Sequence, residues 1–165
     1  MKAKRAERRK LNRELLDAVV VRDARRVGEL LKRGADANAR DAEHDETPLM
    51  LAARFADAGL VRLLLDAGAE VDARDDKART ALFYAPVPSD VFEALRIAGA
   101  DVDARDGEGN TVLMRKVYES ASLVCVDELL RLGVDPSAEN EDGETAFEIA
   151  ERLGLVKLTE RLARR

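Results

Sequence analysis

The chain has 165 residues, of which 46% are hydrophobic, 37% are charged and only 4% are aromatic. This length suits one domain, and the apolar share excludes a globally disordered chain, so we expect a core of leucine, valine and alanine. The net charge of −5 is unevenly distributed. Residues 1–13 hold seven basic residues and one acidic residue, whereas the remainder holds 21 basic and 32 acidic residues. A basic arm of net charge +6 therefore precedes an acidic body of net charge −11.

The basic arm, residues 1–13, has a helical composition and runs directly into "LNRELLDAVV". Leu11, Leu15 and Val19 share one helical face, so we expect the arm to extend or cap the first helix. The alternatives are an arm that binds nucleic acid or a membrane surface, and an arm that folds back on the acidic body. No apolar run is long enough to span a membrane, and the N-terminus lacks the apolar stretch of a secretory signal. We therefore expect a cytoplasmic protein.

An eight-residue sequence recurs along the chain as "GADANARD", "GAEVDARD", "GADVDARD" and a degraded copy, "GVDPSAEN". These copies begin at Gly34, Gly68, Gly99 and Gly133, with spacings of 34, 31 and 34 residues. Four threonines recur in phase with the glycines, and each opens a short apolar pattern such as "TPLMLAA". They are Thr47, Thr80, Thr111 and Thr145. Self-similarity at a period in this range predicts a stack of repeated units.

The chemistry of one repeat predicts two helices. Its threonine is placed to cap the first helix, and Pro48 fits the first turn of that helix, where a missing N–H costs nothing. A second helix carries paired leucines, as in "VRLLLDAG", and the glycine ends it because that position favours a left-handed backbone. No single unit can bury its apolar faces alone. Stacking against neighbouring units would bury them.

This pattern resembles the ankyrin repeat, through "TPLMLAARFADAGLVRLLLDAGAEVDARD" and "DGEGNTVLM" in particular. The resemblance covers about residues 14–162. It implies an all-α ankyrin-repeat solenoid of about five helix-turn-helix units with β-hairpin-like finger loops. We expect these units to form a single domain, residues 14–165, preceded by the arm. The expected units are about 14–40, 41–74, 75–105, 106–139 and 140–165.

Three features depart from the family pattern. The histidine that usually follows "TPL" is replaced in every unit, so we expect its hydrogen bond to be absent. In the third unit, the prolines of "APVPSD" should prevent the first helix from extending past Ala85. In the fourth unit, Lys116 stands where a small packed alanine is normal. The residues that replace the histidine are Met50, Phe83, Met114 and Glu148.

The sequence contains no persuasive catalytic or metal-binding set. His44 is its single histidine and Cys125 its single cysteine, which excludes an intramolecular disulfide and most zinc sites. The acidic stretch "DVDARDGEGN" lacks the spacing and terminal glutamate of a calcium loop. Cys125 occupies an apolar helical position, so we expect a buried, inert thiol, which fits a reducing compartment. We expect no enzyme activity, no cofactor and no metal.

The resemblance implies that partners dock on the finger loops and on the first helices, which line a concave face. Carried over by position, the finger candidates are Glu43, His44, Glu46, Asp76, Lys77, Arg79, Glu108, Asn110, Glu141, Asp142 and Glu144. The first-helix candidates are Val20, Val21, Arg54, Phe55, Tyr118, Glu119 and Arg152. Most of these side chains could equally be solvated surface residues.

Phe55 and Tyr118 are the strongest candidates, since aromatic residues are over-represented among interface anchors. The alternative is that each ring packs against a neighbouring unit. The shortened third unit offers a further candidate, a notch in the concave wall flanked by Arg79, Tyr84 and Val87. A tolerated deletion without a role would explain the same sequence.

We therefore expect a non-catalytic module, monomeric on its own, that binds another protein through the finger and first-helix face. The fingers are acidic overall, with net charges of −3, +1, −1 and −4 along the chain. An acidic rim would favour a basic partner and repel nucleic acid, although ordinary solubility also explains it. The excess of arginine over lysine, 21 to 7, suggests a GC-rich bacterial genome. By analogy with bacterial ankyrin proteins, an immunity-type inhibitor of a co-encoded basic toxin is an alternative, as is a nucleic-acid or membrane adaptor that uses the arm.

Overall fold

The computed structural model describes residues 2–163 and confirms an all-α fold. Ten helices lie in this part of the chain, and its only β interaction is an isolated antiparallel bridge between Arg105 and Thr111. The finger loops are therefore built from turns rather than from strands. The helices are α1 Lys2–Val20, α2 Ala24–Lys32, α3 Pro48–Arg54, α4 Ala58–Asp66, α5 Ala81–Tyr84, α6 Asp90–Ile97, α7 Val112–Ser120, α8 Leu123–Arg131, α9 Ala146–Arg152 and α10 Val156–Leu162.

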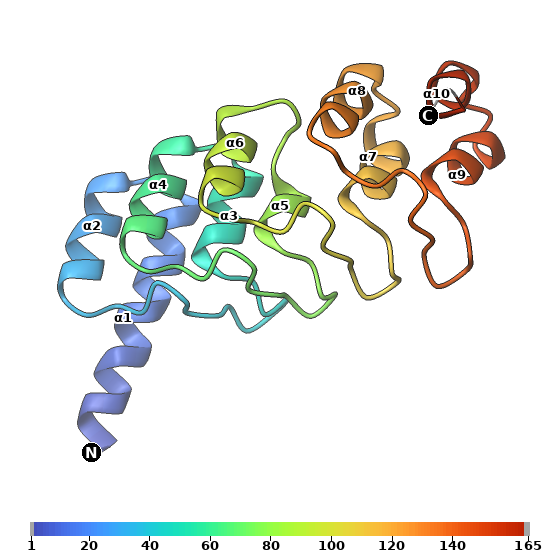
Figure 1. The fold of residues 1–165 in the computed structure, drawn as a ribbon. Coiled ribbons are helices and arrows are strands. Elements are labelled where there is room, and N and C mark those ends of the chain that lie inside the picture. Colours follow the sequence, from blue (N-terminus) through green and yellow to red (C-terminus); the bar gives the residue numbers. More distant parts are fainter. Residues whose placement is uncertain (1, 164–165) are drawn as a thin grey trace. The chain divides into compact units, whose positions relative to one another are not determined.

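The chain divides into two compact units. Unit 1 runs up to Asp76 and also includes Thr80–Ala100. Within unit 1, the first helices α1, α3 and α5 form one layer, and the second helices α2, α4 and α6 form the other (Figure 1). Unit 2 comprises Lys77–Arg79 and the chain from Asp101 onward, where α7 packs on α9 and α8 packs on α10. In both units each helix pair also packs internally, so apolar faces are buried between successive pairs.

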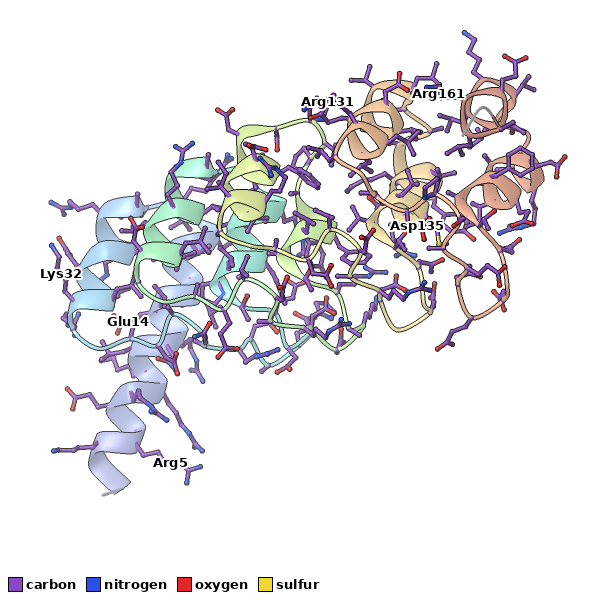
Figure 2. All side chains as sticks on the ribbon, in the orientation of Figure 1. Arg5, Glu14, Lys32, Arg131, Asp135 and Arg161 are labelled. Carbon is purple, nitrogen blue, oxygen red and sulfur yellow. The ribbon has the colours of Figure 1, made fainter. Side chains whose placement is uncertain are left out.

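Helix α1 continues without interruption through the basic arm. Residues 4–10 are exposed, and Leu11 is the first buried residue between residues 4 and 20. The start of α1 extends beyond α2, and Figure 2 shows Arg5 on this protruding segment. Further along, Glu14 accepts a 2.7 Å hydrogen bond from Arg26 Nη2 and ties α1 to α2. The arm is thus a helical extension of the first repeat.

The recurring eight-residue sequence binds one repeat to the next. Its glycine closes the second helix with a positive φ, 92° at Gly34 and 86° at Gly68, as the left-handed position requires. Its arginine, Arg40 in unit 1, donates from Nη1 to the carbonyl of Asp45 in its own finger and to the carbonyl of Arg74 in the following repeat. Arg105 makes the same pair of bonds in unit 2, to Gly109 and Glu139. The repetition of the sequence therefore reflects a repeated bond between layers.

Threonine caps begin the first helices in three of the four predicted cases. The hydroxyls of Thr47, Thr111 and Thr145 accept from the backbone N–H three residues on. Thr80 does not cap α5, and its buried hydroxyl oxygen has no hydrogen-bond partner among the residues that the structure describes. The reason is the tight turn of this four-residue helix, in which the Phe83 N–H donates to the backbone carbonyl of Thr80 instead.

In three repeats the residue that replaces the histidine accepts a hydrogen bond from the backbone N–H of the capping threonine, a contact that the sequence did not predict. The backbone N–H of Thr47 points at Met50 Sδ at 3.4 Å, and that of Thr111 points at Met114 Sδ at the same distance. Glu148 accepts the corresponding N–H of Thr145 at 2.6 Å and completes a capping box. Sulfur is a weak acceptor, so the methionines satisfy the donor less well than the carboxylate does.

Replacing the capping threonines by valine should separate their roles. We expect Thr47→Val to lower the free energy of unfolding by about 1 kcal/mol, because the Met50 N–H loses its acceptor. Thr80→Val should change it by no more than roughly 0.5 kcal/mol or raise it, because a buried hydroxyl without a partner is removed. Urea denaturation followed by circular dichroism measures both, and an equal loss in the two variants would contradict the assignment.

The third repeat is short, as predicted, and α5 ends at Tyr84, before the prolines. Val87 is buried with only 7% of its surface exposed, so it packs inside unit 1 rather than lining an accessible notch as expected. Helix α6 then buries Val91, Phe92 and Leu95. Cys125 is buried in α8, as predicted.

Candidate functional site

In unit 1, a stacked arginine and tyrosine lie above a buried glutamate at the base of the first finger. The carboxylate of Glu46, which is 2% exposed, accepts a hydrogen bond from Arg54 Nη2. The Arg54 guanidinium lies 4.5 Å from the centre of the Tyr84 ring, and the Tyr84 hydroxyl donates to the carboxylate of Asp75. Burial acts to lower the pKa of Arg54, but the hydrogen bond and charge of Glu46 outweigh it and raise the pKa.

In unit 2, a similar cluster has its glutamate and arginine at equivalent positions, whereas its tyrosine comes from the preceding repeat instead of the following one. Glu144 precedes the capping threonine as Glu46 does, and Arg152 lies eight residues later, as Arg54 does. Arg152 binds both carboxylate oxygens of Glu144, at 2.7 and 2.8 Å, and donates to the Tyr118 hydroxyl at 2.8 Å. Its guanidinium lies 5.8 Å from the centre of the Tyr118 ring. Each unit therefore presents a cation that is fixed by a glutamate and backed by a tyrosine.

These two clusters have the chemistry of an interface anchor. A guanidinium held in a fixed plane is ready to form paired hydrogen bonds with a carboxylate or to stack on another ring. Arg54 is 41% exposed along its side chain and Arg152 is 51% exposed, so both are accessible to a partner. Ordering them in advance reduces the entropy that binding would cost.

The predicted aromatic pair is only partly exposed. Tyr118 is 37% exposed, whereas Phe55 is half-buried and lies under the guanidinium of Arg22, 5.9 Å from the ring centre. The sequence left two alternatives for Phe55, an exposed anchor or a packed ring. The structure shows an intermediate case, in which part of the side chain is packed and part is accessible. Arg22 is a contributor to this surface that the sequence did not indicate.

Two of the predicted finger residues are buried under the finger surface and are not part of it. Glu46 and Asn110 are each only 2% exposed, which corrects the expectation that they face a partner. Asn110 Nδ2 donates to Glu108 at 3.0 Å, and Asn110 Oδ1 accepts from Asn140 Nδ2 at 3.0 Å. Both residues directly precede a capping threonine, where the chain turns inward to start the helix.

The finger tips carry the remaining predicted residues. His44 lies 3.9 Å from the carboxylate of Asp76, and the Asp76 N–H donates to the His44 carbonyl, so these two fingers are joined in unit 1. In unit 2 the carbonyls of Lys77 and Glu108 accept from the N–H groups of Gly107 and Glu141. The exposed members are Glu43, His44, Asp76, Lys77, Glu108, Glu141 and Asp142, whereas Arg79 is half-buried.

The first and last fingers are rigid because an acceptor at the start of each one gathers backbone donors. Asp41 Oδ1 accepts from the N–H groups of Glu43, His44 and Glu46, and Asn140 Oδ1 accepts from those of Asp142 and Glu144. Burial acts to raise the pKa of Asp41, but the three backbone donors outweigh it and lower the pKa. The finger tips are therefore held in place before any partner arrives.

Helix α7 adds charged side chains that the sequence singled out only in part. Lys116, only 7% exposed, is paired with Glu119 at 3.1 Å, which explains how a lysine is accommodated at a position normally occupied by alanine. Arg115 lies 3.5 Å from Asp106 and 3.6 Å from Glu108, so it joins the helix to its finger. Sequence reasoning missed Arg115 because nothing in its spacing distinguishes it from a solvated residue.

Within residues 2–163, no three or more histidine, cysteine, aspartate or glutamate side chains gather in a way that could hold a metal ion. None of the helices in that range is long and apolar enough to cross a membrane.

The pKa of Glu144 should report directly on the cluster in unit 2. Its pKa is lowered, chiefly by the hydrogen bond from Arg152. We expect Arg152→Ala to raise it toward the ordinary glutamate value of 4.5, because the carboxylate loses its cationic donor. Carboxyl ¹³C NMR titration measures the change, with Asp41 as an internal control whose pKa should not move. A Glu144 pKa that stays low in the variant would show that Arg152 is not its main partner.

The chain is similar in sequence to known ankyrin-repeat proteins. A family model described as ankyrin repeats (three copies) matches residues 15–106, more than half of the chain. The Neurogenic locus Notch protein of Drosophila melanogaster is 42% identical over 71 residues, which are 43% of this chain and 3% of that protein. The Ankyrin repeat and SOCS box protein 6 of Mus musculus is 42% identical over 77 residues, which are 46% of this chain and 18% of that protein. The chain thus spans less than a fifth of the length of these relatives.

Proposed function

Because the chain belongs to the ankyrin-repeat family, a family of protein-interaction modules, we propose that it binds a specific protein partner through its fingers and first helices without catalysing a reaction. The observation that carries this proposal is the repeated cluster of a glutamate-held arginine and a tyrosine, once in each unit. Arginine and tyrosine are enriched among the residues that dominate binding energy.

The charge of the accessible finger side chains supports a basic partner. Glu43, Glu141 and Asp142 are exposed, and within the described residues none of them takes part in an ion pair. By contrast, Asp45 is neutralised by Arg40 at 2.9 Å, and Glu144 by Arg152. Unpaired carboxylates at an interface rim steer a cationic partner and fix its orientation. A basic toxin held inactive by this surface is the more specific form of the proposal.

Capture of a protein from the native cells by the immobilised chain tests the proposal. We expect a partner that binds the wild type and the charge-reversed control Glu160→Lys, whose residue lies on the second helix α10. Binding should fall steeply for the double variant Glu141→Lys/Asp142→Lys and should weaken as salt is added. If the same partner bound the double variant as well as the wild type, the finger surface would not be its site. Loss of binding only after residues 1–10 are removed would favour the arm instead.

A further inference from the structure

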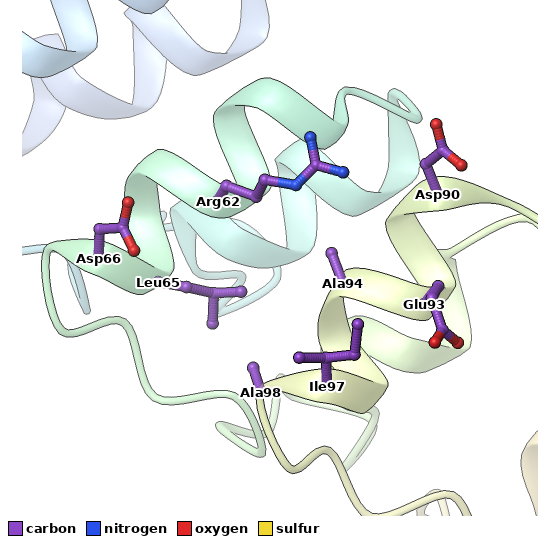
Figure 3. Close-up of a pocket in the computed structure, with 8 residues that line it drawn as sticks. All are labelled: Arg62, Leu65, Asp66, Asp90, Glu93, Ala94, Ile97 and Ala98. Carbon is purple, nitrogen blue, oxygen red and sulfur yellow. The ribbon is translucent and has the colours of Figure 1, made fainter.

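A groove on the second-helix layer of unit 1 lies away from the fingers. It lies between α4 and α6 and has a volume of about 330 Å³ (Figure 3). Leu65 from α4 and Ala94 and Ile97 from α6 line it with apolar side chains. Ile97 is 73% exposed and lines the groove together with Leu65 and Ala94, so its side chain adds to an apolar lining rather than standing alone.

The position of Ile97 in the repeat makes its exposure informative. Four second helices, α2, α4, α6 and α8, are closed by a glycine, and the last residue of each helix lies two positions before its glycine. In two of the four helices this last residue is basic, as the negative end of the helix dipole favours. The two departures, Asp66 and Ile97, both line the same groove. The four residues are Lys32 in α2, Asp66 in α4, Ile97 in α6 and Arg131 in α8.

Asp66 is in an electrostatically unfavourable place. It is the last residue of α4, where the helix carbonyls already concentrate negative charge, and no basic residue lies in the last turn. Within the described residues no ion pair reaches Asp66 or Asp90, the acid at the other end of the groove. Arg62 also lines the groove but forms no ion pair with either of them, although Asp66 is four residues along the same helix. The groove therefore combines an exposed aliphatic contact with a local demand for a cation.

We propose that this groove binds an amphipathic helix of another protein that presents an aliphatic side chain to Ile97 and Leu65 and a lysine or arginine to Asp66. A third helix fits between two parallel helices because its side-chain ridges enter the groove between theirs. The cation neutralises Asp66 and the carboxyl end of α4 at once. This surface is separate from the finger face, so the two can be occupied independently.

A peptide selection tests the proposal. A phage-displayed library of 16-residue peptides is panned against the full wild-type chain in the presence of excess soluble Ile97→Lys protein, which removes peptides that bind elsewhere. We expect the surviving peptides to carry leucine, isoleucine or valine three or four positions from lysine or arginine. Survivors without this pattern, or the absence of survivors, would overturn the proposal.

The affinity of the most enriched peptide, labelled with a fluorophore, gives the decisive comparison. We expect its dissociation constant to rise at least tenfold, in fluorescence anisotropy, for Ile97→Lys and for Asp66→Lys. Val124→Lys is the matched control, because Val124 is 62% exposed on the second helix α8, and it should stay within twofold of the wild type. Asp66→Lys restores the cation that α2 and α8 carry, so misfolding does not explain a loss. Wild-type self-association that Ile97→Lys abolishes would instead make a second copy the occupant and refute a foreign helix.

Discussion

Leu64→Ala should lower the free energy of unfolding by about 2–5 kcal/mol. Leu64 is fully buried in α4, which contacts α3 within its own repeat and both α2 and α6 in the neighbouring repeats. Removing its isobutyl group leaves a cavity at the point where three repeats meet, and closely packed helices relax only partly into such a space. Urea denaturation with the midpoint and slope both fitted measures the loss.

Leu153→Ala is the matched control for this cavity. Leu153 is 43% exposed, so the same truncation should change the free energy of unfolding by less than roughly 0.5 kcal/mol. Similar losses for the two variants would mean that unit 1 is not held together by packing between successive helix pairs.

Arg152→Ala should weaken binding of the protein partner by about thirtyfold or more. The guanidinium is fixed by Glu144 and Tyr118 before binding, so a contact made by it costs little ordering entropy. Its removal also takes away the cation that is paired with the Glu144 carboxylate. Surface plasmon resonance with the captured partner measures the change.

Two control variants distinguish this anchor from a general effect of charge. Arg161→Ala also removes a paired arginine, but from α10, where it binds Asp127, and should leave affinity within about twofold of the wild type. Arg152→Lys keeps the charge and loses the two-point contact with Glu144, so it should behave more like alanine than like arginine. Full affinity in Arg152→Ala would remove this cluster from the binding site.

The repeat architecture could be predicted from the sequence because its signals are local and recur. The glycines that close the second helices and the prolines that shorten α5 act through their own backbone restrictions, so each is visible in one sequence. The recurring eight residues also revealed the period, although not the reason for it. Only the structure shows Arg40 bonded to the carbonyl of Arg74, a residue in the next repeat.

The predictions that were wrong share a physical cause, which is that side-chain environments depend on neighbours distant in sequence. Glu46 and Asn110 lie in polar loops, yet both are buried by the turn that leads into the next helix. Thr80 has the sequence context of a cap, but its four-residue helix directs the available N–H to a carbonyl. Met50 showed no sign of hydrogen bonding in the sequence, since sulfur rarely acts as an acceptor for a cap.

The sequence placed the proposed binding face by position, but it did not indicate how the side chains of that face are organised. The sequence placed Arg54, Tyr84, Tyr118 and Arg152 among the candidates, but it could not show which of them are paired. The pairing joins residues of adjacent repeats, 30 and 34 positions apart, because stacking brings the first helices of neighbouring repeats together. A cluster of this kind is visible only when the repeats are in register.

Amide hydrogen exchange on the complex with the captured partner tests the proposed binding face most directly. We expect added protection in the fingers, residues 41–46 and 140–144, and in the first helices α3 and α9, with no change in the second helices α8 and α10. Protection confined to second helices, with the fingers exchanging as they do in the free chain, would contradict the assignment of this face as the site of binding.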